Sequence, residues 1–165
     1  MEPEDVIREI EAAFDGITKP ITSLRQFKLT DEKGMKGEIT DKEWKNAGLM
    51  RQDTKWQEIP DSEIEECDCL LAHMQPDEFI YYLPAYMRFS VTHYKLPIWK
   101  SGVLGSTVFS LYPSSKNKEG YIYQEKQLSL LNEKQKQTII YFLEFVANYA
   151  NDVERPDAKL ALERY

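Results

Sequence analysis

The chain is poor in cysteine and glycine and has no long apolar run. Two of its 165 residues are cysteine and seven are glycine, which excludes disulfide-rich and collagen-like proteins. The most apolar stretch, residues 138–150, is far shorter than the roughly 20 residues that cross a bilayer. The first residues carry acids instead of the basic and apolar regions of a secretory signal. We therefore expect a cytoplasmic protein with reduced thiols and no contact with a membrane.

A cluster of basic residues is also missing. Lys and Arg number 21 against 28 Asp and Glu, a net charge of −7, so a nucleic acid is not an expected partner. Aromatic residues make up 12% of the chain, enough apolar area to exclude intrinsic disorder. One domain is expected over residues 1–165, with a core of about 4–151 and a tail or short C-terminal helix at 152–165.

Apolar residues that recur every three or four positions predict a mainly α-helical, single compact domain of about five helices. The helices are expected at residues 4–14, from 41 onwards, at about 61–75, at 76–94 and at 133–151. Trp44 is expected to point inward, and Pro84 predicts a kink or a break into two shorter helices. The 133–151 helix is apolar almost all round, so we expect it in the core against residues 79–94.

A minor β element is expected beside these helices. Residues 26–29 and 121–123 favour short strands, the latter because of their residue types. Residues 103–112 fit either a buried strand or a helix, and both interpretations stay open. Residues 113–120 are expected to form a surface loop.

The common catalytic motifs are absent. The chain lacks the phosphate-binding loop, the dinucleotide-binding glycine motif, the zinc-binding His-Glu-x-x-His and the serine nucleophile elbow. No cofactor and no catalytic residue is therefore predicted. Any nucleophilic pair must use His73 or His93. A small hydrolase or ligand-binding enzyme, with one of these histidines and carboxylates near the aromatic segment, stays as the alternative function.

A metal site is considered at Cys67, Cys69 and His73. Cys69 and His73 share a helix face, but Cys67 and Cys69 are separated by about 200° on a helix and cannot reach one ion together. We therefore predict no metal and expect Cys67 to be a buried core residue.

The densest aromatic segment spans residues 79–89. Tyr81, Tyr82, Tyr86 and Arg88 are candidate binding residues, either lining a ligand pocket or forming a contact surface for another protein. An aromatic stripe at helical spacing is also typical of a core helix whose tyrosine hydroxyls lie at its boundary. We favour the core interpretation, because it needs no ligand.

The negative charge is concentrated in residues 58–78, which contain eight acids and no Lys or Arg. Two successive helix starts account for acids here, because the helix dipole favours negative charge at its N-terminus. The alternative is a docking face for a protein with a basic surface. Its candidate binding residues are Glu63, Glu65, Glu66 and Asp68.

Several motifs in a fixed order resemble an uncharacterised bacterial family of small proteins. They are Trp56-x-x-Ile59-Pro60, then Pro76-Asp77-x-Phe79-x-Tyr81-Tyr82-Leu83-Pro84-Ala85-Tyr86-Met87, then Leu130-Leu131-Asn132. The resemblance covers residues 7–150. It implies a bacterial cytosolic protein of one domain and brings no activity with it.

A non-enzymatic protein-interaction module is the favoured function. One form of it is an immunity-type inhibitor that presents an acidic surface to a basic partner. That form predicts a toxin-like gene beside this one. The oligomeric state is not predicted.

Overall fold

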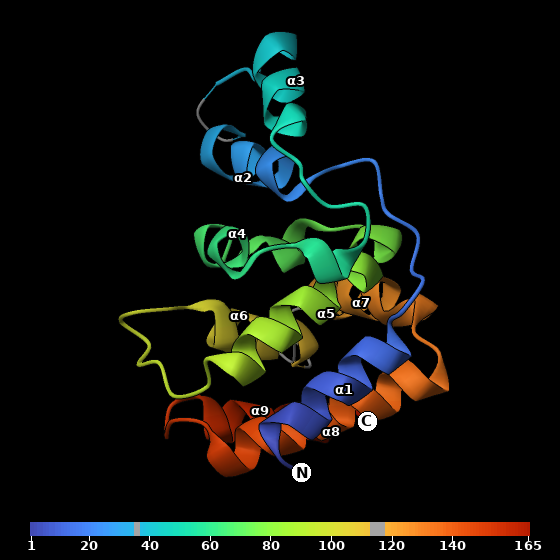
Figure 1. The fold of residues 1–165 in the computed structure, drawn as a ribbon, viewed down its shortest axis with the longest axis vertical. Helices are drawn as coiled ribbons and strands as arrows, with labels where there is room; N and C mark the ends of the chain where they lie inside the picture. The colour runs from blue at the N-terminus through green and yellow to red at the C-terminus, as the bar shows by residue number, and fades with distance from the viewer. Residues whose placement is uncertain (35–36, 113–117) are drawn as a thin grey trace.

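A computed structural model describes residues 1–34, 37–112 and 118–165, and within these ranges the chain is helical and contains no strand (Figure 1). The α-helices of this part are α1 (Pro3–Ala13), α2 (Leu24–Lys33), α3 (Asp41–Leu49), α4 (Asp61–Glu66), α5 (Pro76–Thr92), α6 (Val103–Leu111), α7 (Lys118–Gln127), α8 (Glu133–Tyr149) and α9 (Glu154–Leu162). Short 3-10 helices are η1 (Trp56–Glu58), η2 (Leu70–His73) and η3 (Leu128–Leu130). No helix in these ranges is both long and apolar enough to span a membrane.

The predicted β element and the count of five helices are wrong. Residues 26–29 lie in α2, whose start is fixed by a capping box between Ser23 and Gln26. Residues 121–123 lie in α7, and residues 103–111 form α6. Aromatic and β-branched residues favour strands only where a sheet exists to pack against, and the described residues form no sheet. Of the expected loop at 113–120, residues 113–117 lie outside the described residues and 118–120 begin α7.

The helix expected at about 61–75 is divided in two. Cys67 (φ −113°, ψ 43°) and Cys69 (φ −118°, ψ 19°) depart from helical geometry between α4 and η2. The apolar side chains of Ile64, Leu71 and Met74 are nevertheless buried, as is Cys67. The break therefore redirects the backbone while keeping the predicted apolar residues in the core.

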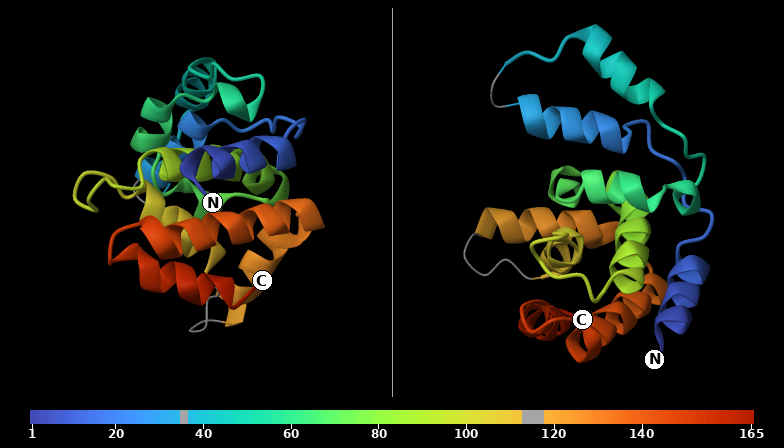
Figure 2. Two further views of the ribbon diagram at one scale, coloured as in Figure 1. Left: turned by 60° about the horizontal axis from the view of Figure 1, so that its bottom comes forward. Right: turned by 60° about the vertical axis from the view of Figure 1, so that its left-hand side comes forward.

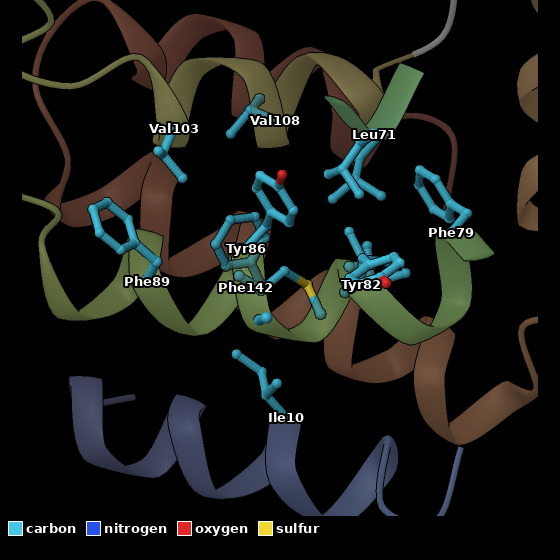
Figure 3. Packing of buried hydrophobic residues seen from close by; sticks show 14 of the residues in the cluster. Ile10, Leu71, Phe79, Tyr82, Tyr86, Phe89, Val103, Val108 and Phe142 are labelled. Carbon is cyan, nitrogen blue, oxygen red and sulfur yellow. The ribbon is translucent and has the colours of Figure 1, made fainter. Parts of the chain in front are cut away.

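Helix α5 runs through the centre of the molecule. Figure 3 shows α6 with Val103 and Val108 on one side of it and α1 with Ile10 on the other. The helix is continuous across Pro84, so the prediction of two shorter helices is wrong. Proline has no backbone N–H and so removes one hydrogen bond from the helix. Burial of almost all residues of α5 stabilises the helix and offsets this loss.

Helix α8 begins as predicted and packs mainly against α1 and α9. Asn132 and Gln135 form a capping box, and the side-chain amide nitrogen of Gln135 also donates to the carbonyl of Ala13 at 3.2 Å. The expected contact with α5 is present but smaller. Figure 1 shows α1, α8 and α9 together at one end of the molecule.

Helices α2 and α3 lie together at the opposite end (Figures 1 and 2). Thr40 and Glu43 form a capping box, and α3 starts at Asp41, where a helix was expected. The inward placement of Trp44 is wrong, because its side chain is 38% exposed. Helix α3 packs chiefly on α2 and buries no residue, so no core surrounds the indole.

Candidate functional site

The three candidate tyrosines of α5 lie in the core. Tyr81, Tyr82 and Tyr86 are fully buried, and each hydroxyl donates to a group of the chain. Tyr81 donates to the Asp53 carboxylate at 2.6 Å, Tyr82 to the carbonyl of Thr22 at 2.8 Å, and Tyr86 to the carbonyl of Cys67. Burial raises the pKa of all three hydroxyls, so they are protonated at neutral pH.

Arg88 is the fourth candidate of this segment and holds a turn of the backbone. Its guanidinium donates to the carbonyls of Gln57 and Ile59, each at 2.9 Å, and lies 5.3 Å from the centre of the Trp56 ring. The Trp56 indole in turn donates to the carbonyl of Phe14 at 2.8 Å. Arg88 therefore joins α5 to η1, with cation–π contact to a buried ring.

A polar network lies at the boundary of the core beside Tyr81. The Arg51 guanidinium contacts the buried Asp53 carboxylate at 3.1 Å and donates to the carbonyl of Pro20 at 2.6 Å. Glu63, only 7% exposed, lies 3.9 Å from Arg25. Burial raises the pKa of Glu63, and the nearby guanidinium of Arg25 offsets this in part.

The acids of residues 58–78 divide into two groups. Glu58 and Glu78 accept from backbone amides at the starts of η1 and α5, as expected of helix N-termini. Glu66 pairs with Arg25 at 2.5 Å, and this hydrogen bond lowers the pKa of Glu66. Of the four candidate acids, Glu65 and Glu66 are exposed to solvent, whereas Glu63 is buried and Asp68 half-buried.

The fold brings further acids from α2 beside this group. A surface hollow of about 180 Å³ lies between α2 and the end of α4, lined among others by Asp31, Glu32, Glu66 and Asp68. Lys28 is the one basic residue that lines it. Four carboxylates therefore surround one hollow, two from α2, one from the end of α4 and one from the segment that follows α4.

A second hollow of about 380 Å³ lies between α2 and α3. Its apolar lining comes from Leu29, Ala47 and Met50, and Met50 is 56% exposed. Lys28 and Glu32, which are 3.8 Å apart, line this hollow and the acidic one alike. The two hollows are therefore parts of one surface along α2, and we call it the α2 groove.

The two histidines lie apart from one another, each beside one carboxylate. His73 Nε2 is 3.0 Å from Asp31, and His93 Nε2 is 3.0 Å from Asp61. Neither histidine lines any of four cavities formed by described residues, and neither does Arg88 or a buried tyrosine of α5. The convergent pocket that the enzyme alternative requires is not formed by these four.

Metal-binding side chains do not gather in the described part of the chain, where no three of His, Cys, Asp and Glu are placed to hold an ion. Cys67 is buried as expected and Cys69 is exposed. Burial, as the main cause, raises the pKa of both thiols to about 11, so both are protonated at neutral pH.

Comparison with known proteins supplies a family. The model of a family of unknown function, DUF6714, matches residues 2–165. The chain belongs to DUF6714. The expected membership of an uncharacterised family is thereby confirmed. No curated protein and no solved structure matches the chain.

The α2 groove of this DUF6714 protein contains residues that the sequence interpretation missed. Asp31 and Glu32 lie in α2, where only a short strand at residues 26–29 was predicted, and Met50 directly follows α3. The Ser23-x-x-Gln26 spacing in the sequence could have located α2, because it is typical of a helix start. A helix that begins there places Lys28 and Glu32 on one face.

Proposed function

We propose that this protein is a non-enzymatic protein-binding module and that the α2 groove is its contact surface. The observation that carries the proposal is the continuity of the two hollows, since Lys28 and Glu32 line both. An apolar centre beside a charged rim is the usual composition of a protein interface.

The apolar half of the groove supplies the anchor. Met50, directly after α3, lines it, and Trp44 and Leu49 are exposed side chains of α3. Helix α3 buries no residue of its own in the domain. A helix that exposes several large apolar side chains is typical of a surface that another protein covers.

The acidic half of the groove selects the partner. Asp31, Glu32, Glu66 and Asp68 line it with a single lysine. A partner with a basic surface matches this charge, and long-range attraction accelerates its association. An immunity-type inhibitor of a basic protein is one form of such a module, and it carries the expectation of a toxin-like gene beside this one.

Capture from native lysate with point variants tests the proposal. The tagged protein is expected to retain a stoichiometric partner at about 50 mM salt and to release it as the salt concentration rises. Glu32→Lys is expected to weaken capture at least about tenfold. Glu11→Lys, the same charge reversal at an exposed position of α1, is expected to leave capture unchanged.

A second pair of variants tests the apolar half. Met50→Glu is expected to abolish capture, whereas Leu130→Glu, at a site of similar exposure (54%) in η3, is expected to preserve it. The proposal fails if no stoichiometric partner is retained at low salt. It also fails if the groove variants and their controls retain the partner equally.

A further inference from the structure

A larger hollow of about 680 Å³ lies between η2, α6 and α7. Phe109 of α6, Tyr123 of α7 and Leu71 of η2 are among the residues that line it. The volume falls within the range of small-molecule sites. It borders the α2 groove at Cys69 and shares no other lining residue with it.

Two helical glycines line this hollow. Gly105 is the third residue of α6 and Gly120 the third residue of α7, positions where alanine is the more favourable residue. Neither has a positive φ. A Cβ built on Gly105 meets no atom within 4 Å, so packing does not require glycine there. Because glycine has no side chain, neither residue fills any part of the hollow.

Four polar side chains that line the hollow use donor hydrogens within the chain, and a fifth, Gln124, accepts from Arg164 at 3.3 Å. Each hydrogen bond that the four donate is accepted by a backbone carbonyl. The Ser106 hydroxyl donates to Asp68 (2.5 Å), the Ser110 hydroxyl to Thr107 (2.7 Å) and the Tyr123 hydroxyl to Met74 (3.1 Å). The side-chain amide of Gln127 donates to Leu71 (3.0 Å) and Met74 (2.9 Å). The oxygens of these four side chains remain able to accept. None of the described residues that line the hollow is Lys, Arg, Asp or Glu.

We propose that this hollow binds a small, neutral and mostly apolar molecule that carries a hydrogen-bond donor, such as an apolar alcohol, phenol or arylamine. Its donor meets an acceptor oxygen of the wall, and its apolar body covers Phe109 and Leu71. A carboxylate is disfavoured, because it would lose water and the described lining residues offer no cation to pair with. This site is independent of protein binding at the α2 groove.

Fluorescence titration with N-phenyl-1-naphthylamine, a neutral arylamine, tests the site. The probe is expected to bind saturably with one site per chain. 1-Decanol is expected to displace it at least about tenfold more effectively than decanoate or decyltrimethylammonium, which have the same chain and a charged end.

Variants that fill the hollow locate the binding. Gly105→Leu and Ala72→Phe are each expected to weaken probe binding at least about tenfold. Ala72 is exposed on η2, so its replacement leaves the core intact if Gly105→Leu fails to fold. Ala12→Leu, which adds the same side chain to the exposed surface of α1, is expected to bind the probe as the wild type does.

Three results would overturn the assignment. One is the absence of saturable probe binding to the wild-type chain. Another is equal displacement by decanol and decanoate, or equal binding by the filled variants. The third is a concentration-dependent dimer in light scattering that Gly105→Leu abolishes, since the hollow would then be covered by a second copy.

Discussion

At the scale of single residues, Tyr81 is a buried tyrosine whose hydroxyl is hydrogen-bonded to the buried carboxylate of Asp53. Its hydroxyl donates to Asp53 Oδ2 at 2.6 Å, and the Arg51 guanidinium contacts the same oxygen at 3.1 Å. Tyr81→Phe is therefore expected to lower the free energy of unfolding by about 1.5–3 kcal/mol, the usual range for a hydrogen bond to a charged group. Urea unfolding measures the loss. The matched control Tyr149→Phe, on a ring 47% exposed, is expected to change it by less than about 0.5 kcal/mol.

Glu63 makes stability depend on pH in the opposite sense to most carboxylates. Burial raises its pKa above the ordinary 4.5, so the folded state keeps a proton that the unfolded state has lost. Stability from this group is present below pH 4.5 and is lost as the pH rises through the folded pKa. Glu63→Gln is expected to gain stability relative to the wild type between about pH 4 and about pH 7. A difference that stays constant with pH in urea unfolding contradicts this.

The sequence located some residues of the candidate surface and could not locate others. Glu66 and Asp68 were found from local charge density alone. Asp31, Glu32 and Met50 join them only through the packing of α2 on α3 and η2, contacts between segments far apart in the chain. No local pattern encodes such a contact, so composition indicated the charge of the surface but not its extent.

At the scale of elements, α3 depends on its cap more than the buried helices do. Thr40 accepts from the Glu43 amide at 3.1 Å, and the helix buries no residue. Thr40→Ala is expected to cost about 1 kcal/mol of local stability. Hydrogen exchange of the α3 amides should accelerate about fivefold while α8 exchanges as before.

The matching variant at α8 is expected to act on the whole domain. Asn132→Ala removes the same kind of cap from a helix that packs against α1 and α9. The free energy of global unfolding should fall by about 1 kcal/mol. Helix α3 is expected to unfold separately from the rest of the domain. A loss of global stability in Thr40→Ala as large as that in Asn132→Ala would contradict this.

Helix starts were predictable where local hydrogen bonds define them, at Thr40 and Asn132. Strands were wrongly predicted at residues 121–123 because residue type was weighed without the tertiary partner that a strand needs. The break at Cys67 was missed for a related reason. The apolar spacing of Ile64, Leu71 and Met74 survives it, so periodicity alone could not reveal a change in backbone direction.

At the scale of the whole molecule, one domain over residues 1–165 remains a prediction that unfolding can test. Trp56 is buried, whereas Trp44 and Trp99 are exposed, so a Trp44→Phe, Trp99→Phe variant reports the core through one indole. Its fluorescence and the far-ultraviolet circular dichroism are expected to change at the same urea concentration. Separated midpoints indicate more than one cooperative unit.

The net charge of the whole chain is −7, and its acids lie in more than one structural setting. Acids at the starts of η1 and α5 stabilise helices, while those of the α2 groove are brought together by the fold. We therefore place the proposed partner at the end formed by α2, α3 and α4, away from α1, α8 and α9 (Figure 1).

The most direct test of protein binding at the α2 groove is hydrogen exchange of the chain alone and in complex with its captured partner. New protection is expected at the amides of α2, α3 and α4, with α8 and α9 unchanged. Protection confined to α8 and α9, or absent from α2 and α3, would contradict the proposed contact surface.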